Sequence, residues 1–429
     1  MSRELIDLTA PTERALLVGA PRKGRYAKHR TAEHLEELAR LADTAGAIVV
    51  GEVVQQIERP NPATYLGKGK VEELTQTIAD KDATLLLFDD ELSPSQGKNI
   101  EDITGKRVMD RAELILDIFA TRARSAEAKM QVELAQLQYM LPRLTRMWAH
   151  LEKFRGGIGV RGPGETQLET DRRLISHRIK ILGQRLAEVQ KSREVQRGSR
   201  RGEFQASLVG YTNAGKSSIL RSLAADSSIF VENRLFATLD PLTREVELAE
   251  GESILLTDTV GFVRKLPHQL VASFRATLEE VLQANVLLHV IDIADPLWED
   301  HRAVVVEVLT ELGANHIPMI NVFNKSDLLP PHELEAVRGR ISNLIPDAVF
   351  ASAEEENGLD ALRRALLRRL RAERRVFELR VQLSDGRLMA ELHRNGDVLA
   401  QRTEGDEMIV SVRLSPEALG RLGARAVAV

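Results

Sequence analysis

Apolar residues recur along the N-terminal part of the chain with two alternating periods. Short apolar runs lie at 15–18, 47–54 and 84–88, and one-sided stretches lie at 32–44, 70–81 and 112–124. Runs of about four to eight apolar residues are typical of strands, and apolar positions three or four apart are typical of helices. Because strands and helices alternate, we predict a small α/β domain over residues 1–124.

From residue 125 the apolar positions keep one spacing, three or four apart, over two long stretches. The first runs from Leu134 to Leu151 and the second from Leu168 to Val189. Between them, residues 155–164 hold five glycines and a proline, which interrupt a helix. We therefore predict an antiparallel helical hairpin with a glycine-rich tip over residues 125–202, ending in a basic linker.

Residues 203–375 return to alternating strands and helices. The strand candidates are 204–209, 254–257, 286–293, 317–323 and 348–351, and four of these five runs are almost continuously apolar, as buried parallel strands are. Residues 376–429 predict a small α+β domain with strands near 376–383 and 408–414. The pattern as a whole predicts a multidomain α/β protein.

Composition excludes several classes of protein. The chain has 429 residues, a net charge of −4 and no cysteine, so it can form neither disulfides nor thiolate–metal sites. No stretch approaches the roughly 20 consecutive apolar residues that a membrane span needs. The first eight residues include two acids, which is not typical of a signal peptide. We expect a cytoplasmic monomer.

A phosphate-loop pattern follows the apolar run that ends at Val209. It comprises Gly210, Tyr211, Thr212, Asn213, Ala214, Gly215, Lys216 and Ser217. A helix-like stretch at 218–225 comes next, which is the context that this pattern requires. We expect the loop amides to surround the β-phosphate, Lys216 to bridge the β- and γ-phosphates, and Ser217 to place its hydroxyl on Mg²⁺.

Two later segments are expected to sense Mg²⁺ and the γ-phosphate. One closes an apolar strand and comprises Asp258, Thr259, Val260 and Gly261. Asp258 can hold Mg²⁺ through water, and Gly261 can donate its amide to the γ-phosphate. The other comprises Phe236, Ala237, Thr238, Leu239 and Asp240. Thr238 can ligate Mg²⁺ only when the γ-phosphate is present, so its loop is a candidate switch. The predicted metal ligands are Ser217, Thr238 and Asp258, and the predicted catalytic residues are Lys216, Thr238 and Gly261.

The nucleobase is expected to meet two further segments. The first follows the apolar run 317–323 and comprises Asn324, Lys325, Ser326 and Asp327. The Asp327 carboxylate can accept two hydrogen bonds from guanine N1 and N2. Adenine lacks this donor pair, so such a pocket rejects it strongly. The second segment, Ser352, Ala353 and Glu354, is expected to offer a backbone amide to guanine O6. The predicted enzyme is a GTPase that converts GTP to GDP and phosphate.

Longer strings around these motifs resemble those of HflX-type GTPases. They lie at 61–70, 156–169, 236–244 and 258–267, and the resemblance covers roughly residues 14–370. It implies a cytoplasmic translation factor of the TRAFAC class that binds the large ribosomal subunit and its RNA and can split stalled or idle ribosomes. It also implies ATP binding by the N-terminal domain, at most in the region 67–70. K⁺ beside Asn213 is a further implied ion, and a loop-stabilising hydrogen bond is the alternative role of this residue.

One position departs from the scheme of Ras-like enzymes. Phe262 follows Gly261, where those enzymes place a glutamine that orients the attacking water. A phenylalanine cannot orient water by hydrogen bonding. We therefore predict slow intrinsic hydrolysis that a partner accelerates.

The predicted hairpin is strongly basic. Residues 143–201 hold fifteen Lys or Arg against six Asp or Glu, a local charge of +9 in a chain of −4. The basic residues include Arg143, Arg146, Lys153, Arg155, Arg161, Arg172, Arg173, Arg178 and Lys180. Such a stripe suits RNA phosphates, although a solvated helix face is the alternative. The function predicted first is a ribosome-stimulated GTPase switch. The alternative is an RNA-binding assembly or remodelling module with regulatory nucleotide sites, ATP-dependent through its N-terminal domain.

Overall fold

The chain folds into two compact units in the computed structural model. The described residues are 12–22, 27–144, 163–197, 203–229, 231–232, 234–265, 280–373, 375–414, 419 and 427–428. The first unit comprises Met1–Val189, Glu232–Asp240 and Val260–Thr277. The second unit comprises Gln190–Val231, Pro241–Thr259 and Leu278–Val429. Among the described residues, no helix is long and apolar enough to cross a membrane.

A four-stranded parallel sheet forms the N-terminal domain, as the alternating pattern predicted. Its strands, in the order β2-β1-β3-β4, are β1 (Arg14–Gly19), β2 (Ile48–Val54), β3 (Leu85–Phe88) and β4 (Arg107–Asp110). Its helices are α1 (Ala27–Thr44), α2 (Lys68–Lys81), α3 (Pro94–Thr104) and α4 (Arg111–Arg122). The strand order reverses between β1 and β3, and crevices that bind ligands form at such reversals.

The apolar pattern did not predict α3 or β4. Helix α3 depends on a capping box, in which the Ser93 hydroxyl accepts from the Gln96 amide and the Gln96 side chain accepts from the Ser93 amide. Strand β4 has only four residues, too few to show a period. Both elements are therefore specified by end signals and pairing rather than by apolar periodicity.

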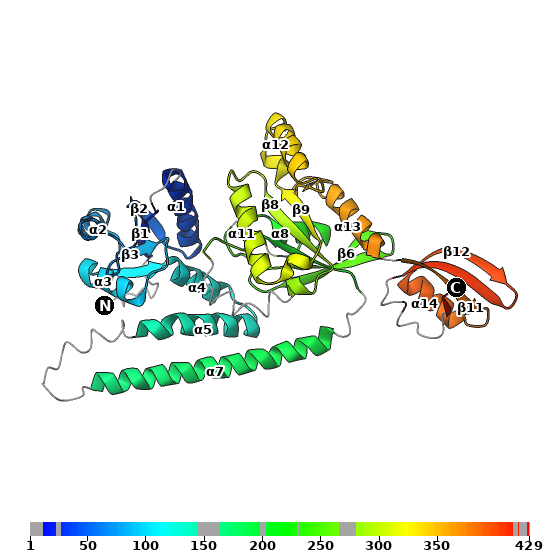
Figure 1. Cartoon of the computed structure of the whole chain (residues 1–429), viewed down its shortest axis with the longest axis horizontal. Coiled ribbons are helices and arrows are strands. Elements are labelled where there is room, and N and C mark those ends of the chain that lie inside the picture. The colour runs from blue at the N-terminus through cyan, green and yellow to red at the C-terminus, as the bar shows by residue number, and fades with distance from the viewer. Residues whose placement is uncertain are drawn as a thin grey trace, which may run out of the picture. The chain divides into compact units, whose positions relative to one another are not determined.

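Two helices follow the N-terminal domain, α5 (Ala126–Met140), continued by the short 3-10 helix η1 (Leu141–Arg143), and α7 (Pro163–Arg197). They lie side by side (Figure 1), and Arg178 of α7 pairs with Glu133 of α5 at 2.6 Å. Most of the predicted glycine-rich tip lies outside the described residues. Helix α7 already begins at Pro163, because proline is well tolerated at the first helical position.

A six-stranded mixed sheet carries the phosphate loop. Its order is β10-β9-β8-β5-β7-β6, and only β6 is antiparallel to its neighbour. The strands are β5 (Gln205–Gly210), β6 (Leu242–Ala249), β7 (Glu252–Asp258), β8 (Val286–Asp292), β9 (Met319–Asn324) and β10 (Val349–Phe350). The helices are α8 (Lys216–Leu223), α11 (Trp298–Glu311), η3 (Ala314–His316), η4 (Ser326–Leu328), α12 (Pro331–Leu344) and α13 (Asp360–Glu373).

The C-terminal part forms a separate small sheet with one helix. Its elements are β11 (Arg375–Gln382), α14 (Gly386–Asn395), β12 (Asp397–Glu404), β13 (Glu407–Leu414) and β14 (Val427–Ala428). The sheet is antiparallel, in the order β12-β13-β11-β14. Leu379, Val410 and Leu392 are fully buried in its core. The two predicted strands are present, and the multidomain α/β fold class is confirmed.

Candidate nucleotide site and its switch segments

The phosphate loop connects β5 to α8, the arrangement that its sequence predicted. Gly215 has a φ of +94°, and a Cβ atom there would lie 2.2 Å from Nδ2 of Asn324. Only glycine fits both conditions. Nδ2 of Asn324 also donates to the carbonyl of Ala214 at 3.0 Å. The phosphate loop is therefore packed directly against residues 324–327, which we call the base-reading turn.

Lys216 is held inside its own loop. Its Nζ atom donates to the carbonyls of Tyr211 at 2.9 Å and Gly210 at 3.2 Å. Burial lowers the pKa of Lys216 to about 8; the Asp258 carboxylate opposes this shift and the charge of Lys325 adds to it. At neutral pH the ammonium is mostly charged and suits a phosphate ligand.

Two of the three predicted metal ligands meet in the second unit. The Ser217 hydroxyl donates to Oδ2 of Asp258 at 2.6 Å, and the Asp258 side chain is buried at the end of β7. Hydroxyl and carboxylate oxygens are the ligands that Mg²⁺ prefers, so this pair fits the ion. Thr238 belongs to the first unit, and its role at the metal stays a prediction. The neighbouring Thr259 donates its hydroxyl to the carbonyl of Leu208 at 2.6 Å, which fixes the backbone beside Asp258.

The base-reading turn leaves the end of β9. Lys325 adopts a left-handed φ of 64°, and its Nζ atom lies 2.6 Å from Oδ2 of Asp292. The hydroxyl of Ser326 donates to the carbonyl of Ala351 at 3.0 Å, and Ser326 is buried. Asp327 is exposed at the tip of the turn, where its carboxylate is accessible to a ligand.

The segment predicted to read guanine O6 is fixed by its own hydrogen bonds. The Ser352 amide donates to the carbonyl of Gly358 at 3.1 Å. The Ser352 hydroxyl accepts from the amides of Glu354 and Glu355 at 3.3 and 3.2 Å. Because the Ser352 amide is engaged, the Ala353 amide is the better candidate for O6.

The segment after Gly261 is held by side chains of the N-terminal domain, within the first unit. Phe262 and Val263 are each 1% exposed. Arg264 offers its carbonyl to Nε of Arg111 at 3.2 Å and its own Nε to Glu37 at 3.3 Å. Nζ of Lys265 then lies 2.7 Å from a carboxylate oxygen of Asp89 and 2.7 Å from one of Asp90.

The centre of this network is Arg111, the first residue of α4. Its guanidinium is 2% exposed and donates to Oδ1 of Asp89 at 2.9 Å and to a carboxylate oxygen of Glu37. We call Glu37, Asp89, Asp90 and Arg111 the switch-holding network. A buried guanidinium needs such partners, because an uncompensated charge inside a protein is very costly.

The segment that contains Thr238 is also held within the first unit. Asp240 accepts from the amides of Arg124 at 3.2 Å and Ser125 at 3.1 Å, where Ser125 is the N-cap of α5. Phe236 packs edge-on against Phe119, with ring centroids 4.7 Å apart. Both candidate switch segments therefore pack on the N-terminal half of the chain. The residues that hold these segments have no mutual spacing in the sequence that could have predicted their role.

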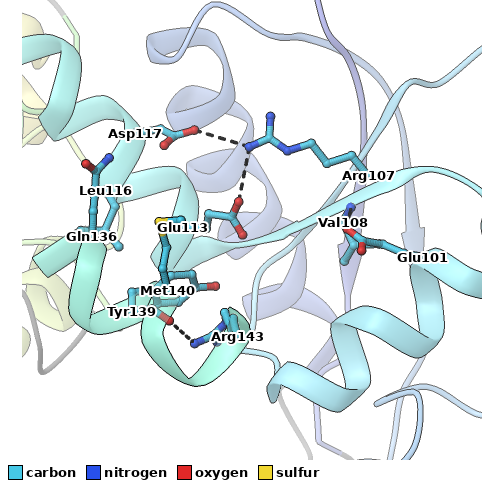
Figure 2. Close-up of a pocket in the computed structure, with 10 residues that line it drawn as sticks. All are labelled: Glu101, Arg107, Val108, Glu113, Leu116, Asp117, Gln136, Tyr139, Met140 and Arg143. Atoms are coloured by element: carbon cyan, nitrogen blue, oxygen red, sulfur yellow. Dashed lines mark hydrogen bonds and ion pairs between the residues drawn. The ribbon is translucent and has the colours of Figure 1, made fainter. Parts of the chain in front are cut away.

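Arg143, which was counted in the basic stripe, makes its contacts with residues of the first unit. Figure 2 shows it beside Tyr139 at the edge of a cavity of about 420 Å³. Its guanidinium lies 3.6 Å from the Tyr139 ring centroid and donates to the carbonyl of Leu92 at 2.7 Å and to Asp110 at 3.4 Å. Arg178 pairs with Glu133, as described above. The tip residues Arg146, Lys153, Arg155 and Arg161 lie outside the described residues.

The segment predicted to contact ATP caps a helix. The Gly67 amide donates to Gln55 at 3.0 Å, and Lys70 pairs with Glu73 at 2.7 Å. A cavity of about 340 Å³ lies beside it, at the carboxyl ends of β1 and β3. It is lined by Gly19, Ala20, Pro21, Arg22, Thr31, His34, Leu35, Tyr65, Asp89, Asp90 and Lys265. The two carboxylates of this lining are balanced by Arg22 and Lys265, so its charge does not favour a phosphate chain, and ATP binding stays a prediction.

Comparison with known proteins covers nearly the whole chain. Family models match residues 32–120 (GTP-binding GTPase N-terminal), 122–200 (GTP-binding GTPase Middle Region) and 205–325 (50S ribosome-binding GTPase). GTPase HflX of Caldanaerobacter subterraneus subsp. tengcongensis is 44% identical over 414 residues, covering 95% of this chain and 92% of its own. GTPase HflX of Magnetococcus marinus is 44% identical over 426 residues, covering 97% and 96%. The solved complex of SsGBP with GDP covers 83% of this chain and 98% of its own, with 26% identity and a TM-score of 0.47.

The mixed sheet and its phosphate loop define a P-loop GTPase, an enzyme that hydrolyses GTP to GDP and phosphate and works with Mg²⁺. With this identity to curated relatives along almost its full length, the chain belongs to the HflX family of GTPases. The resemblance predicted from the sequence is confirmed.

Proposed function

We propose that this chain is a GTP-driven switch of the cytoplasm that binds the large ribosomal subunit and dissociates or rescues ribosomes. The observation that carries the proposal is Phe262, directly after Gly261. Its apolar side chain is 1% exposed and cannot orient an attacking water. A partner that completes the site would therefore accelerate hydrolysis. The match of residues 205–325 to 50S ribosome-binding GTPases supports the large subunit as that partner.

Within this function, the residues of the nucleotide site take distinct roles. Lys216 and the loop amides bind the β- and γ-phosphates, and the Gly261 amide senses the γ-phosphate. Ser217 and Asp258 would hold Mg²⁺, and Thr238 would add a ligand when GTP is bound. The ion would neutralise phosphate charge and orient the phosphates. Asp327 selects guanine.

The RNA-facing surface of this switch includes the outer face of α7. Arg172, Arg173 and Lys180 are exposed on that helix, unlike Arg143. Exposed cations on one helix suit the phosphates of ribosomal RNA, and binding through them weakens steeply as salt rises. Replacing all three by Gln should weaken ribosome binding and flatten its dependence on salt. GDP affinity should not change.

Ribosome sedimentation with GTP, GDP and a non-hydrolysable GTP analogue tests the proposal. We expect binding with the analogue, release with GDP, and a shift of ribosomes toward free subunits with GTP. Single-turnover hydrolysis should be slow for the isolated chain and much faster with ribosomes. Identical sedimentation in all three nucleotides, or fast hydrolysis that ribosomes do not change, would contradict it.

A potassium ion beside the phosphates is a finer part of the proposal. Asn213 adopts a left-handed φ of 62° within the phosphate loop, a conformation that asparagine tolerates better than most residues. We expect turnover to be faster in KCl than in NaCl at equal ionic strength. Asn213→Ala should remove the difference. Equal rates in the two salts would leave Asn213 with a purely structural role.

A further inference from the structure

The segment 292–301, which runs from the last residue of β8 into the first turn of α11, contacts both motif segments of the nucleotide site, although it carries no nucleotide motif itself. At its start, Asp292 reaches the base-reading turn through Lys325, with 2.6 Å between Oδ2 and Nζ. At its end, the ring of His301 stacks on Tyr211 of the phosphate loop, with centroids 3.8 Å apart and planes 13° apart. One short connection therefore supports the turn on one side and the phosphate loop on the other.

Asp292 uses its two carboxylate oxygens for different purposes. Oδ1 accepts from the amide of Ala294 at 3.1 Å and so shapes the loop. Oδ2 faces Lys325, and both side chains are mostly shielded, with exposures of 21% for Asp292 and 25% for Lys325. In the sheet, Asp292 is the direct partner of Asn324, the first residue of the turn. The ion pair thus connects Lys325, the second residue of the turn, to β8, the strand that already pairs with Asn324.

We propose that Asp292 is a positioning residue for guanine recognition, which holds the turn 324–327 in its binding geometry through the ion pair with Lys325. The proposal rests on the proposed role of Asp327 in reading guanine. Lys325 sits in a left-handed backbone conformation that side chains rarely adopt, so the turn needs an external anchor. A lysine side chain is long and flexible, and fixing it before the nucleotide arrives reduces the entropy lost on binding.

The charge on Lys325 gives Asp292 a second effect at the site. Lys325 and Lys216 belong to loops in direct contact, because Nδ2 of Asn324 donates to the carbonyl of Ala214 at 3.0 Å, and the two cations repel each other. Asp292 compensates one of them. Without it, the turn would carry an unbalanced charge beside the phosphate-loop lysine and would tend to move away.

Asp292→Asn separates the two functions of this side chain. The asparagine oxygen can still accept from the Ala294 amide, but the negative charge is gone. We expect GDP to dissociate roughly fivefold to thirtyfold faster, as for loss of a well-shielded charge-assisted hydrogen bond. KM for ribosome-stimulated hydrolysis should rise by a similar factor, and kcat should stay within about twofold.

Lys325→Met tests whether Asp292 acts on GDP release through its ion pair with Lys325. It should accelerate GDP release by a similar factor, and adding Asp292→Asn to it should change nothing further. Glu299→Gln is the matched control, because it removes an acid of α11 from an ion pair of 2.8 Å with Arg340 of α12, and it should leave GDP release unchanged. Equal release by Asp292→Asn and the unmutated protein, or additive effects in the double variant, would overturn the proposal. Equal affinity of the unmutated protein for GDP and ADP would instead refute guanine selection by Asp327.

Discussion

The nucleotide site of the second unit and the switch-holding network of the first unit differ in how the chain encodes them. The site consists of consecutive residues, 210–217 and 324–327, because one ligand meets neighbouring backbone and side-chain groups. The network joins Glu37 of α1, Asp89 just after β3 and Arg111 at the start of α4. Ligand-binding loops are therefore visible as local strings, whereas a side-chain network exists only once the fold has assembled it.

The largest effect should come from the network. Arg111→Met removes the cation between Glu37 and Asp89, and breaking a buried ion pair from one side costs about 3–5 kcal/mol. We expect a marked fall in the melting temperature of the first unit, which calorimetry would measure. GDP affinity, measured by titration, should change less than about fivefold.

Arg340→Met is the control for that experiment. It breaks an exposed ion pair with Glu299, with side chains 57% and 61% exposed, and such pairs contribute at most about 1 kcal/mol. Strong weakening of GDP binding by Arg111→Met, with an unchanged melting temperature of the first unit, would contradict the assignment of stability to the network and of nucleotide binding to the site.

The next effect lies in the nucleotide site. Asp327→Asn replaces the carboxylate that is predicted to accept from guanine N1 and N2. Losing these bonds should cost about 2–4 kcal/mol, or roughly 30-fold to 1,000-fold in GDP affinity, because an amide cannot accept from both the N1 and the N2 donor of the base as the carboxylate can. The melting temperature without nucleotide should not move, since Asp327 is exposed. Asp347→Asn, an exposed acid elsewhere in the second unit, should change neither quantity.

The pH dependence of GDP affinity tests the role of Lys216 as a charged phosphate ligand. Its pKa is about 8 in the nucleotide-free protein, lowered chiefly by burial. Phosphates bind the charged form better, so GDP affinity should be level below pH 8 and fall about tenfold per pH unit above it. Titrations from pH 7 to pH 9 would measure this. Lys216→Arg stays protonated and should bind more weakly with a flatter profile; any slope that it retains comes from deprotonation of guanine itself.

The same contrast explains what the sequence could predict. The phosphate loop, Asp258 and the strands around them follow from local spacing and apolar runs, and the fold class follows from their alternation. The partners of Arg264 and Lys265 could not be predicted, because nothing near Glu37 or Asp89 marks either acid as different from other surface acids. Arg143 is the converse case. It looked like an RNA ligand within a basic run, but Asp110 and Tyr139 hold it inside the first unit.

The smallest effect should appear where the network meets the switch segment. Lys265→Ala removes the contacts of its ammonium with Asp89 and Asp90 and leaves Arg111 in place. The lysine side chain is 40% exposed, so the loss should be about 1 kcal/mol, equivalent to roughly fivefold. We expect amide hydrogen exchange in residues 260–265 to quicken by about that factor.

Lys70→Ala supplies the matched comparison for Lys265→Ala. It also removes a lysine paired at 2.7 Å within the first unit, but its partner Glu73 lies on the same helix, α2, far in sequence from any switch segment. Exchange at 260–265 should therefore stay unchanged in this variant. If Lys265→Ala left exchange there unaltered, the packing of Phe262 and Val263 alone would hold the segment. If both variants quickened it equally, the effect would reflect general loosening of the first unit and not release of the switch.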